Sequence, residues 1–366
     1  MMTHTPEPTV RRPTRRVTDS RFVGHNVLVN TGSLTQWVEV GAACLGLLLA
    51  VSALLTLRLV RRAEGDYPPA GRYVDVDGVR LHYLDRGQGR PVLLIHGFRG
   101  SAYDFEVSIS TRLARYCRVI AFDRPGHGYS ASLPDDQHSL IVEAKQLHAA
   151  ALLLGLERPL LVGYSLGGAV AMAYADAYPG DVAGVITIGG HVMPYRVHVG
   201  PLAFLAKRPL IAGVLSNTLL VPVGRMLGRA ILKRACYPQP VPPSYSKATV
   251  SMALRPRTFR YAPAELRQSA GELRELAQRY GSLPVPVTVV TGHQDAFSGT
   301  KEARYFHERL ADSTLVVVPD GGHALHATHP DVVVTAVRGA IDAASEREDS
   351  PIAAVRVARD GAVASA

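Results

Sequence analysis

The sequence is poor in cysteine and tryptophan. Its 366 residues include only three cysteines, widely separated at Cys44, Cys117 and Cys236, and a single tryptophan, Trp37. This spacing matches neither a disulfide framework nor a zinc site. No nucleic-acid-binding motif is present either. We therefore expect no metal, no cofactor and no nucleic-acid partner.

Acidic side chains are missing from one part of the chain. The segment from Gly200 to Ala235 contains no Asp or Glu, and the longer stretch from His191 to Tyr280 contains 14 Lys and Arg against three acids. That stretch carries a net charge of +11, which leaves −2 for the rest of a chain whose total is +9. This local excess predicts contact with an anionic surface. The other reading is a basic face exposed only to solvent.

Charge is also absent from Val40 to Leu57, an uncharged run of 18 residues. At 1.5 Å per helical residue, such a run approaches the thickness of a bilayer core of about 30 Å. It therefore predicts a transmembrane helix over residues 37–62 and a single-pass, N-terminal membrane anchor. A signal peptide cleaved before Ala53 and a buried helix of a soluble protein are the alternatives, although the apolar run continues past that cleavage site.

The arginines near this run bear on its orientation. Arg58, Arg61 and Arg62 follow it closely and outweigh Arg21, which favours a cytoplasmic position for the C-terminal side. A more distant group of arginines on the N-terminal side, at positions 11, 12, 15 and 16, opposes this orientation.

Short apolar runs closed by turn residues alternate with helical segments through most of the remaining chain. This pattern predicts an α/β fold with a mostly parallel eight-stranded sheet flanked by helices. Strand signals stop between residues 191 and 280, which predicts an inserted helical cap. The expected organisation is a disordered tail at 1–36, the anchor at 37–62, a linker at 63–72, a core at 73–190 and 281–345, and a disordered tail at 346–366.

The segment "GYSLG", Gly163 to Gly167, places a serine between two glycines at the point where an apolar strand gives way to a helix. This is the pattern of a nucleophile elbow, in which a sharp turn exposes the serine hydroxyl. The flanking positions must lack bulk because strand and helix approach each other closely. Ser165 is therefore the candidate nucleophile, and the backbone N–H of Leu166 is a candidate oxyanion-hole donor.

A serine nucleophile needs a histidine base and a carboxylate that orients it. His323 follows the last apolar strand on a Gly-Gly turn, and Asp295 lies on the loop after the preceding strand. His326 and His329 are competing bases, and three histidines at this spacing could also suggest a metal site. No cysteine or carboxylate joins them, however. We expect Asp320 to be too near His323 in the sequence to reach its far ring nitrogen.

The second oxyanion donor should come from the end of an earlier strand. "LLIHGFRGS" meets this requirement, because the N–H of Phe98 can point toward the same site as that of Leu166. We expect His96, in the same segment, to have a structural role.

These segments resemble those of the α/β-hydrolase superfamily. "HGFRG", "DRPGHGYS", "GYSLGG", "GHQD" and "GGHALH" occur in the order of that family's motifs between about Arg72 and Ala344. The resemblance implies Ser165 as nucleophile, His323 as base, Asp295 as orienting acid, and the amides of Phe98 and Leu166 as the oxyanion hole. The serine at position 165 distinguishes this chain from haloalkane dehalogenases and epoxide hydrolases, which have an aspartate at the nucleophile position.

The predicted function is that of a membrane-anchored serine hydrolase, similar to carboxylesterases and lipases, that cleaves esters of apolar or lipid-like substrates through an acyl-enzyme. A carbon–carbon bond hydrolase, a haloperoxidase or perhydrolase with the same triad, and a non-catalytic binding protein remain as alternatives. The expected partners are a small-molecule or lipid-like ester and the membrane, contacted by the anchor and by the basic cap.

Overall fold

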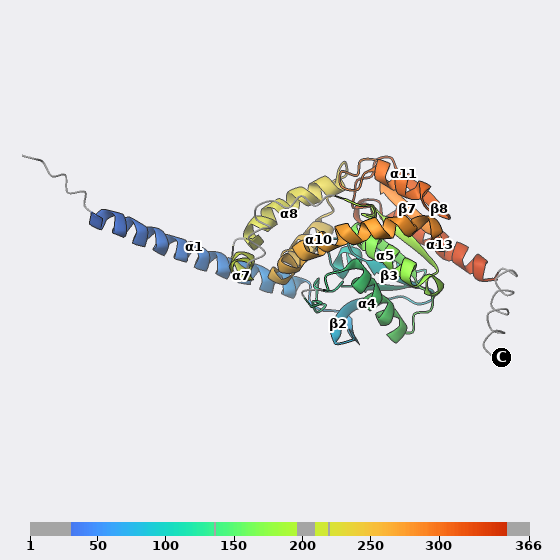
Figure 1. The fold of residues 1–366 in the computed structure, drawn as a ribbon, viewed down its shortest axis with the longest axis horizontal. Coiled ribbons are helices and arrows are strands. Elements are labelled where there is room, and N and C mark those ends of the chain that lie inside the picture. The colour runs from blue at the N-terminus through green and yellow to red at the C-terminus, as the bar shows by residue number, and fades with distance from the viewer. Residues whose placement is uncertain (1–30, 135–136, 196–208, 219, 350–366) are drawn as a thin grey trace, which may run out of the picture. The chain divides into compact units, whose positions relative to one another are not determined.

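The computed structural model describes residues 31–134, 137–195, 209–218 and 220–349. Contacts divide the chain into two units, Met1–Leu47 and Leu48–Ala366, which are considered separately. The described part of the first unit is the beginning of helix α1. The second unit contains the rest of α1 and all the other described elements (Figure 1).

The centre of the second unit is an eight-stranded sheet in the order β1-β2-β4-β3-β5-β6-β7-β8. The pairs β1·β2 and β2·β4 are antiparallel and all other pairs are parallel, as the sequence predicted. The strands are β1 (Arg72–Val76), β2 (Val79–Arg86), β3 (Pro91–Ile95), β4 (Arg118–Phe122), β5 (Leu160–Tyr164), β6 (Gly184–Ile188), β7 (Val287–Gly292) and β8 (Ser313–Val318).

The hairpin between β1 and β2 turns at Asp77 and Gly78. Both have positive φ, 48° and 80°, as a two-residue hairpin turn of this type requires. The Asp-Gly pair therefore forms the turn that the sequence predicted.

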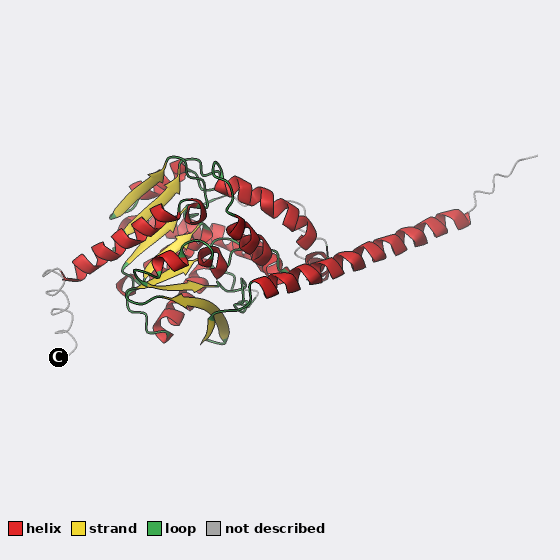
Figure 2. Cartoon of the chain, turned by 180° about the vertical axis from the view of Figure 1, so that it is seen from behind, coloured by secondary structure: helices red, strands yellow, loops and turns green. Residues whose placement is uncertain are grey.

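Helices cover both faces of the sheet, as Figure 2 shows from behind. The helices of the α/β core are α2 (Ala102–Glu106), α3 (Ser110–Leu113), α4 (Leu140–Leu153), α5 (Leu166–Ala177), α11 (Thr300–Glu308), α12 (Leu325–Thr328) and α13 (Pro330–Asp349), with short 3₁₀ turns η1 (Pro179–Asp181) and η2 (Tyr280–Ser282). Helix α13 extends into the segment 346–366, where a tail was expected. Residues 350–366 lie outside the described part of the chain.

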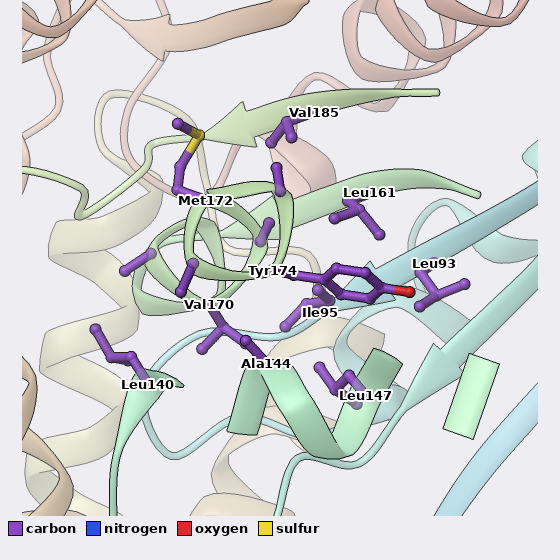
Figure 3. Close-up of a cluster of buried hydrophobic side chains, with 14 of the residues drawn as sticks. Leu93, Ile95, Leu140, Ala144, Leu147, Leu161, Val170, Met172, Tyr174 and Val185 are labelled. Atoms are coloured by element: carbon purple, nitrogen blue, oxygen red, sulfur yellow. The ribbon is translucent and has the colours of Figure 1, made fainter. Parts of the chain in front are cut away.

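Side chains of alternate strand residues pack into two separate hydrophobic cores, one on each face of the sheet. On β3, Leu93 and Ile95 join the core under α4 and α5, whereas Val92 and Leu94 join the core under α2 and α13. Successive side chains of a strand point to opposite faces, so a strand buried on both sides is apolar throughout. Figure 3 shows the first core, where Leu93, Ile95 and Leu161 from the sheet meet Leu140, Ala144, Leu147, Val170, Met172 and Tyr174 from α4 and α5.

Four described helices lie between β6 and β7, within the segment predicted to be a helical cap. They are α7 (Pro209–Asn217), α8 (Leu220–Cys236), α9 (Pro243–Ala253) and α10 (Pro256–Arg279). Two of the basic residues in this segment, Lys207 and Arg208, lie outside the described residues.

Helix α1 spans Thr31–Asp66 and is the long apolar N-terminal helix expected from the sequence. Its portion Leu34–Asp66 is long and apolar enough to cross a membrane, with a mean hydropathy of 2.4 in its most apolar window. A signal sequence near an N-terminus has the same properties. The helix continues beyond residue 62 into the segment predicted to be a linker, and its last turns pack within the second unit. Ala63 is buried, and Glu64 and Asp66 form ion pairs with Arg255 and Lys247.

Candidate active site

Ser165 occupies a sharp turn between β5 and α5. Its backbone has φ 51° and ψ −120°, a conformation that residues other than glycine rarely adopt. The Ser165 N–H donates to Ile188 O at the end of β6, and the Ser165 carbonyl accepts from His191 N–H. These bonds hold a strained backbone in place, as is common where a side chain has a chemical role.

The glycines on either side of Ser165 are required by close approach. A methyl group at Gly163 would clash with the backbone of Gly167, and one at Gly167 would clash with the carbonyl of Ile95. Strand β5, helix α5 and strand β3 are therefore too close together for any larger side chain at these two positions. The local sequence pattern follows directly from this packing.

His323 and Asp295 lie together after β8 and β7. The Nδ1 atom of His323 is 2.9 Å from Oδ2 of Asp295, and both side chains are almost completely buried. The other carboxylate oxygen, Oδ1, accepts from the N–H groups of Phe297 and Ser298 at 2.8 and 3.0 Å. The carboxylate thus receives hydrogen bonds on both oxygens.

Burial alone would raise the pKa of Asp295, but the hydrogen bond and charge of His323 and the two backbone N–H groups outweigh it and lower that pKa. The carboxylate is therefore ionised at neutral pH and can only accept hydrogen bonds. It follows that, in a neutral His323 ring, the proton is on Nδ1 and the lone pair is on Nε2.

The other two histidines of this segment have different surroundings. His326 is completely buried, with its ring 4.2 Å from that of Tyr164, and burial and the nearby His323 lower its pKa to about 3. The Nε2 atom of His329 lies 3.3 Å from Oδ1 of Asp320 on the surface. Asp320 thus lies beside His329, which fits the expectation that it does not serve His323.

The loop after β3 brings Phe98 near the nucleophile. A methyl group on the adjacent Gly97 would lie 2.9 Å from Cβ of Ser165. Leu166 begins helix α5, so its N–H belongs to the positive end of that helix. The two amides predicted to form an oxyanion hole thus come from the loop after β3 and from the first turn of α5.

His96 has both ring nitrogens occupied. Its Nε2 accepts from the N–H of Arg124 at 3.0 Å, and its Nδ1 donates to Gly97 O at 2.8 Å. Burial and the positive charge of Arg124 lower the pKa of His96 to about 3, so the ring is neutral. This arrangement suits the structural role expected for His96.

Arg124 is the centre of a buried ionic cluster that the sequence did not predict. Its Nε donates to Glu143 at 2.8 Å, and its Nη2 donates to Glu265 of α10. Its Nη1 reaches the carbonyls of His96 and Gly97 at 3.3 and 3.2 Å. The cluster therefore joins α10 to the loop that carries Phe98.

Two further residues beside His323 were not anticipated. The ring of Phe297 lies 5.0 Å from that of His323 and is 41% exposed. His191 follows β6, and burial together with the nearby His323 lowers its pKa to about 4. Each follows a strand at the same sheet edge as Ser165, Asp295 and His323. This position after a strand was the one sequence feature from which they could have been predicted as site residues.

A hollow of about 240 Å³ lies at the amino ends of β5, β6 and β7, the edge of the sheet opposite Ser165. Ligands of open α/β sheets bind beyond the carboxyl ends of the strands, so the hollow is unlike an active site in position. Within the described ranges, no three His, Cys, Asp or Glu side chains are grouped as metal ligands would be.

Comparison with known proteins agrees with this fold. Bifunctional epoxide hydrolase 2 of Sus scrofa is 31% identical over 134 residues, which are 36% of this chain and only 24% of that protein. An uncharacterized protein of Mycobacterium tuberculosis (strain ATCC 25618 / H37Rv) is 28% identical over 284 residues, covering 73% of this chain and 79% of that protein.

Among solved structures, a thermophilic esterase from Thermogutta terrifontis superimposes with a TM-score of 0.60 at 25% identity, covering 75% of this chain and 99% of the esterase. Residues 90–330 match the family model for the alpha/beta hydrolase fold. The chain therefore belongs to the α/β-hydrolase family and is a hydrolase of that fold.

Proposed function

We propose that the chain is a membrane-anchored serine hydrolase that cleaves carboxylic esters of apolar or lipid-like substrates. The observation that carries the proposal is the backbone of Ser165, at φ 51°, on the same sheet edge as a buried His323–Asp295 pair at 2.9 Å. A strained serine beside an oriented histidine is the arrangement that nucleophilic acyl transfer requires.

In the proposed mechanism, Nε2 of His323 takes the hydroxyl proton as Ser165 Oγ attacks the ester carbonyl. The ionised Asp295 keeps the proton on Nδ1 and stabilises the imidazolium. The N–H groups of Phe98 and Leu166 donate to the oxyanion of the tetrahedral intermediate. His323 then gives the proton to the leaving alkoxide, and water hydrolyses the acyl-enzyme by the same steps.

Two features support an apolar substrate. Phe98 and Phe297, which adjoin the proposed oxyanion hole and the proposed base, are 37% and 41% exposed. Exposed aromatic rings beside reactive groups offer an apolar surface to a substrate. Helix α1 would hold the enzyme at the membrane, where lipid-like esters reside, and we propose a cytoplasmic position for the catalytic unit.

Activity-based labelling tests the proposal. A fluorophosphonate probe should label the full-length chain and not Ser165→Ala, and the chain should hydrolyse a series of p-nitrophenyl esters from acetate to palmitate. The absence of labelling would reject the serine mechanism. Labelling without ester turnover would redirect the assignment to carbon–carbon bond hydrolysis or perhydrolysis.

A further inference from the structure

The outward face of α8 carries an exposed apolar stripe. Its members recur at helical spacing, and all are exposed: Val223, Met226, Leu227, Ala230 and Ile231. Met226 alone is 77% exposed. The opposite face is buried through Val221, Leu232 and Ala235 against α9 and the core. Helix α8 therefore has two apolar faces, of which the described residues bury one.

Helix α7 continues the exposed surface. Ile211 and Val214 are 41% and 51% exposed, and the two helices bend by 68° at their junction. No Asp or Glu occurs in α7 or α8. We call this pair, residues 209–218 and 220–236, the α7–α8 hairpin.

The hairpin contacts α1 inside the uncharged run of that helix. Ser52 Oγ and Thr56 Oγ donate to the carbonyl of Thr218, at the turn between α7 and α8, at 3.0 and 2.9 Å. All three residues belong to the second unit, and Figure 1 shows α7 beside this portion of α1. The two hydroxyl groups within the run Val40–Leu57 thus supply hydrogen bonds to the Thr218 carbonyl in the turn of the hairpin.

This contact sets a depth for the hairpin. Ser52 precedes Leu57, the end of the run, by five residues, which is about 7.5 Å along a helix axis. Thr56 precedes it by one residue, about 1.5 Å, so a turn joined to Ser52 and Thr56 lies roughly 2–7 Å below the edge of the apolar layer when α1 spans it. Hydrogen bonding of the Thr218 carbonyl is what such a depth demands, because no water is available there.

Three of the four cations of α8 follow the same order. Arg229, Lys233 and Arg234 are exposed and occupy the half of α8 away from the turn, whereas most of the exposed apolar side chains lie in the half near it. The fourth cation, Arg225, lies in the near half and is partly buried. Basic side chains favour the anionic headgroup level, and apolar ones favour the hydrocarbon.

We propose that the α7–α8 hairpin inserts its exposed apolar side chains into the acyl-chain layer of the bilayer that α1 spans, with the exposed cations Arg229, Lys233 and Arg234 at the level of the phosphates. This inference rests on the proposed membrane anchoring and goes beyond it. The cap becomes a second, monotopic membrane element.

Depth-dependent quenching tests the insertion in the full-length chain. A Leu227→Cys variant in a Cys44→Ser background is labelled with an environment-sensitive fluorophore and reconstituted into phosphatidylcholine vesicles whose acyl chains carry nitroxides. Cys117 and Cys236 are buried and should not react. We expect a blue-shifted emission, strong quenching by the nitroxide lipids and little quenching by iodide.

Leu153→Cys in the same background is the matched control. Leu153 ends α4, far from the hairpin in the fold, and is 63% exposed, similar to the 59% of Leu227. Its label should be quenched by iodide and not by nitroxide lipids. Cys44 of the unaltered chain, labelled in the same way, reports on the anchor itself.

The outcomes separate the two proposals. Quenching by nitroxide lipids at Cys44 without quenching at Leu227→Cys would overturn hairpin insertion while the anchor stands. The absence of such quenching at both positions would overturn both. A Leu227→Cys label shielded from iodide and from nitroxide lipids alike would show that a second copy of the chain covers the stripe, which also overturns insertion.

Discussion

Arg124, in the loop after β4, donates a hydrogen bond to Glu265 in the middle of α10, although 141 residues separate them. Both side chains are buried, so neither charge has water to compensate it. The same guanidinium holds the carbonyls of His96 and Gly97, directly before Phe98. One arginine thus couples α10 to the proposed oxyanion loop.

Replacement of Glu265 by alanine should be strongly destabilising. Removing one member of a buried ion pair leaves an uncompensated charge, at a cost of about 3–5 kcal/mol in the free energy of unfolding. Glu143 remains beside Arg124, so we expect the lower end of this range, with a loss of kcat as the Phe98 loop shifts. Denaturant titration and ester kinetics measure the two effects.

Asp176→Asn is the control for that substitution. It breaks the exposed ion pair with Arg279, which should contribute less than about 1 kcal/mol. Equal effects of the two variants on stability would show that burial of the Arg124 cluster has no energetic consequence.

The proposed triad predicts a specific pattern of kinetic losses. Ser165→Ala and His323→Ala should each lower kcat for esters by a factor on the order of 10⁴ or more, and the double variant should be scarcely worse, because the residues act as a unit. His329→Gln, from the same segment, should keep near-normal turnover because its partner is the surface residue Asp320. A normal kcat in His323→Ala would exclude it as the base.

The free energy of unfolding should decrease as the pH is lowered, because of His326. Burial and the nearby His323 lower its pKa from 6.5 to about 3, so below pH 6.5 the unfolded chain binds a proton that the folded chain does not. This histidine therefore reduces the free energy of unfolding by about 1.4 kcal/mol per pH unit between those values. Neither of its ring nitrogens has a hydrogen-bond partner among the described residues.

A His326→Phe variant should consequently be as stable as the parent at pH 7 and lose stability less steeply toward pH 4. The ring would remain among Phe105, Tyr164 and Tyr245. Thermal unfolding in detergent at several pH values measures the slope. A slope unaltered by the substitution would mean that His326 is protonated in the folded chain.

The proposed anchor predicts that full-length protein remains in the membrane pellet after carbonate extraction. A chain beginning at Leu48 should fold and lose this property, because it retains the contacts of Ser52, Thr56 and Glu64 but too few apolar residues to span a bilayer. A chain beginning at Gly65 lacks those contacts and should be less stable. Recovery of a soluble protein whose N-terminus is Ala53 would identify a signal peptide instead.

The parts of the fold that could be predicted from sequence are those encoded locally. A strand buried on both faces is a short apolar run, and the elbow needs only the five residues Gly163–Gly167. His323 and Asp295 could be proposed because each follows a strand at the same sheet edge.

Long-range ion pairs could not be predicted in this way. Nothing near Glu265 indicates that its partner is Arg124. The linker predicted for residues 63–72 overlaps the end of α1 at Asp66, and the contacts of this last turn are long-range as well. In the folded chain, Glu64 pairs with Arg255, which lies 191 residues away.

At position 165, the residue that best suits the backbone conformation differs from the residue that the proposed activity requires. Glycine adopts a φ of 51° at little cost, whereas serine does not. A Ser165→Gly chain should therefore tolerate heat better than the parent while hydrolysing nothing. A screen for thermostability alone would therefore select variants that have lost the nucleophile. Engineering of a more thermostable enzyme must measure turnover as well as residual folded protein.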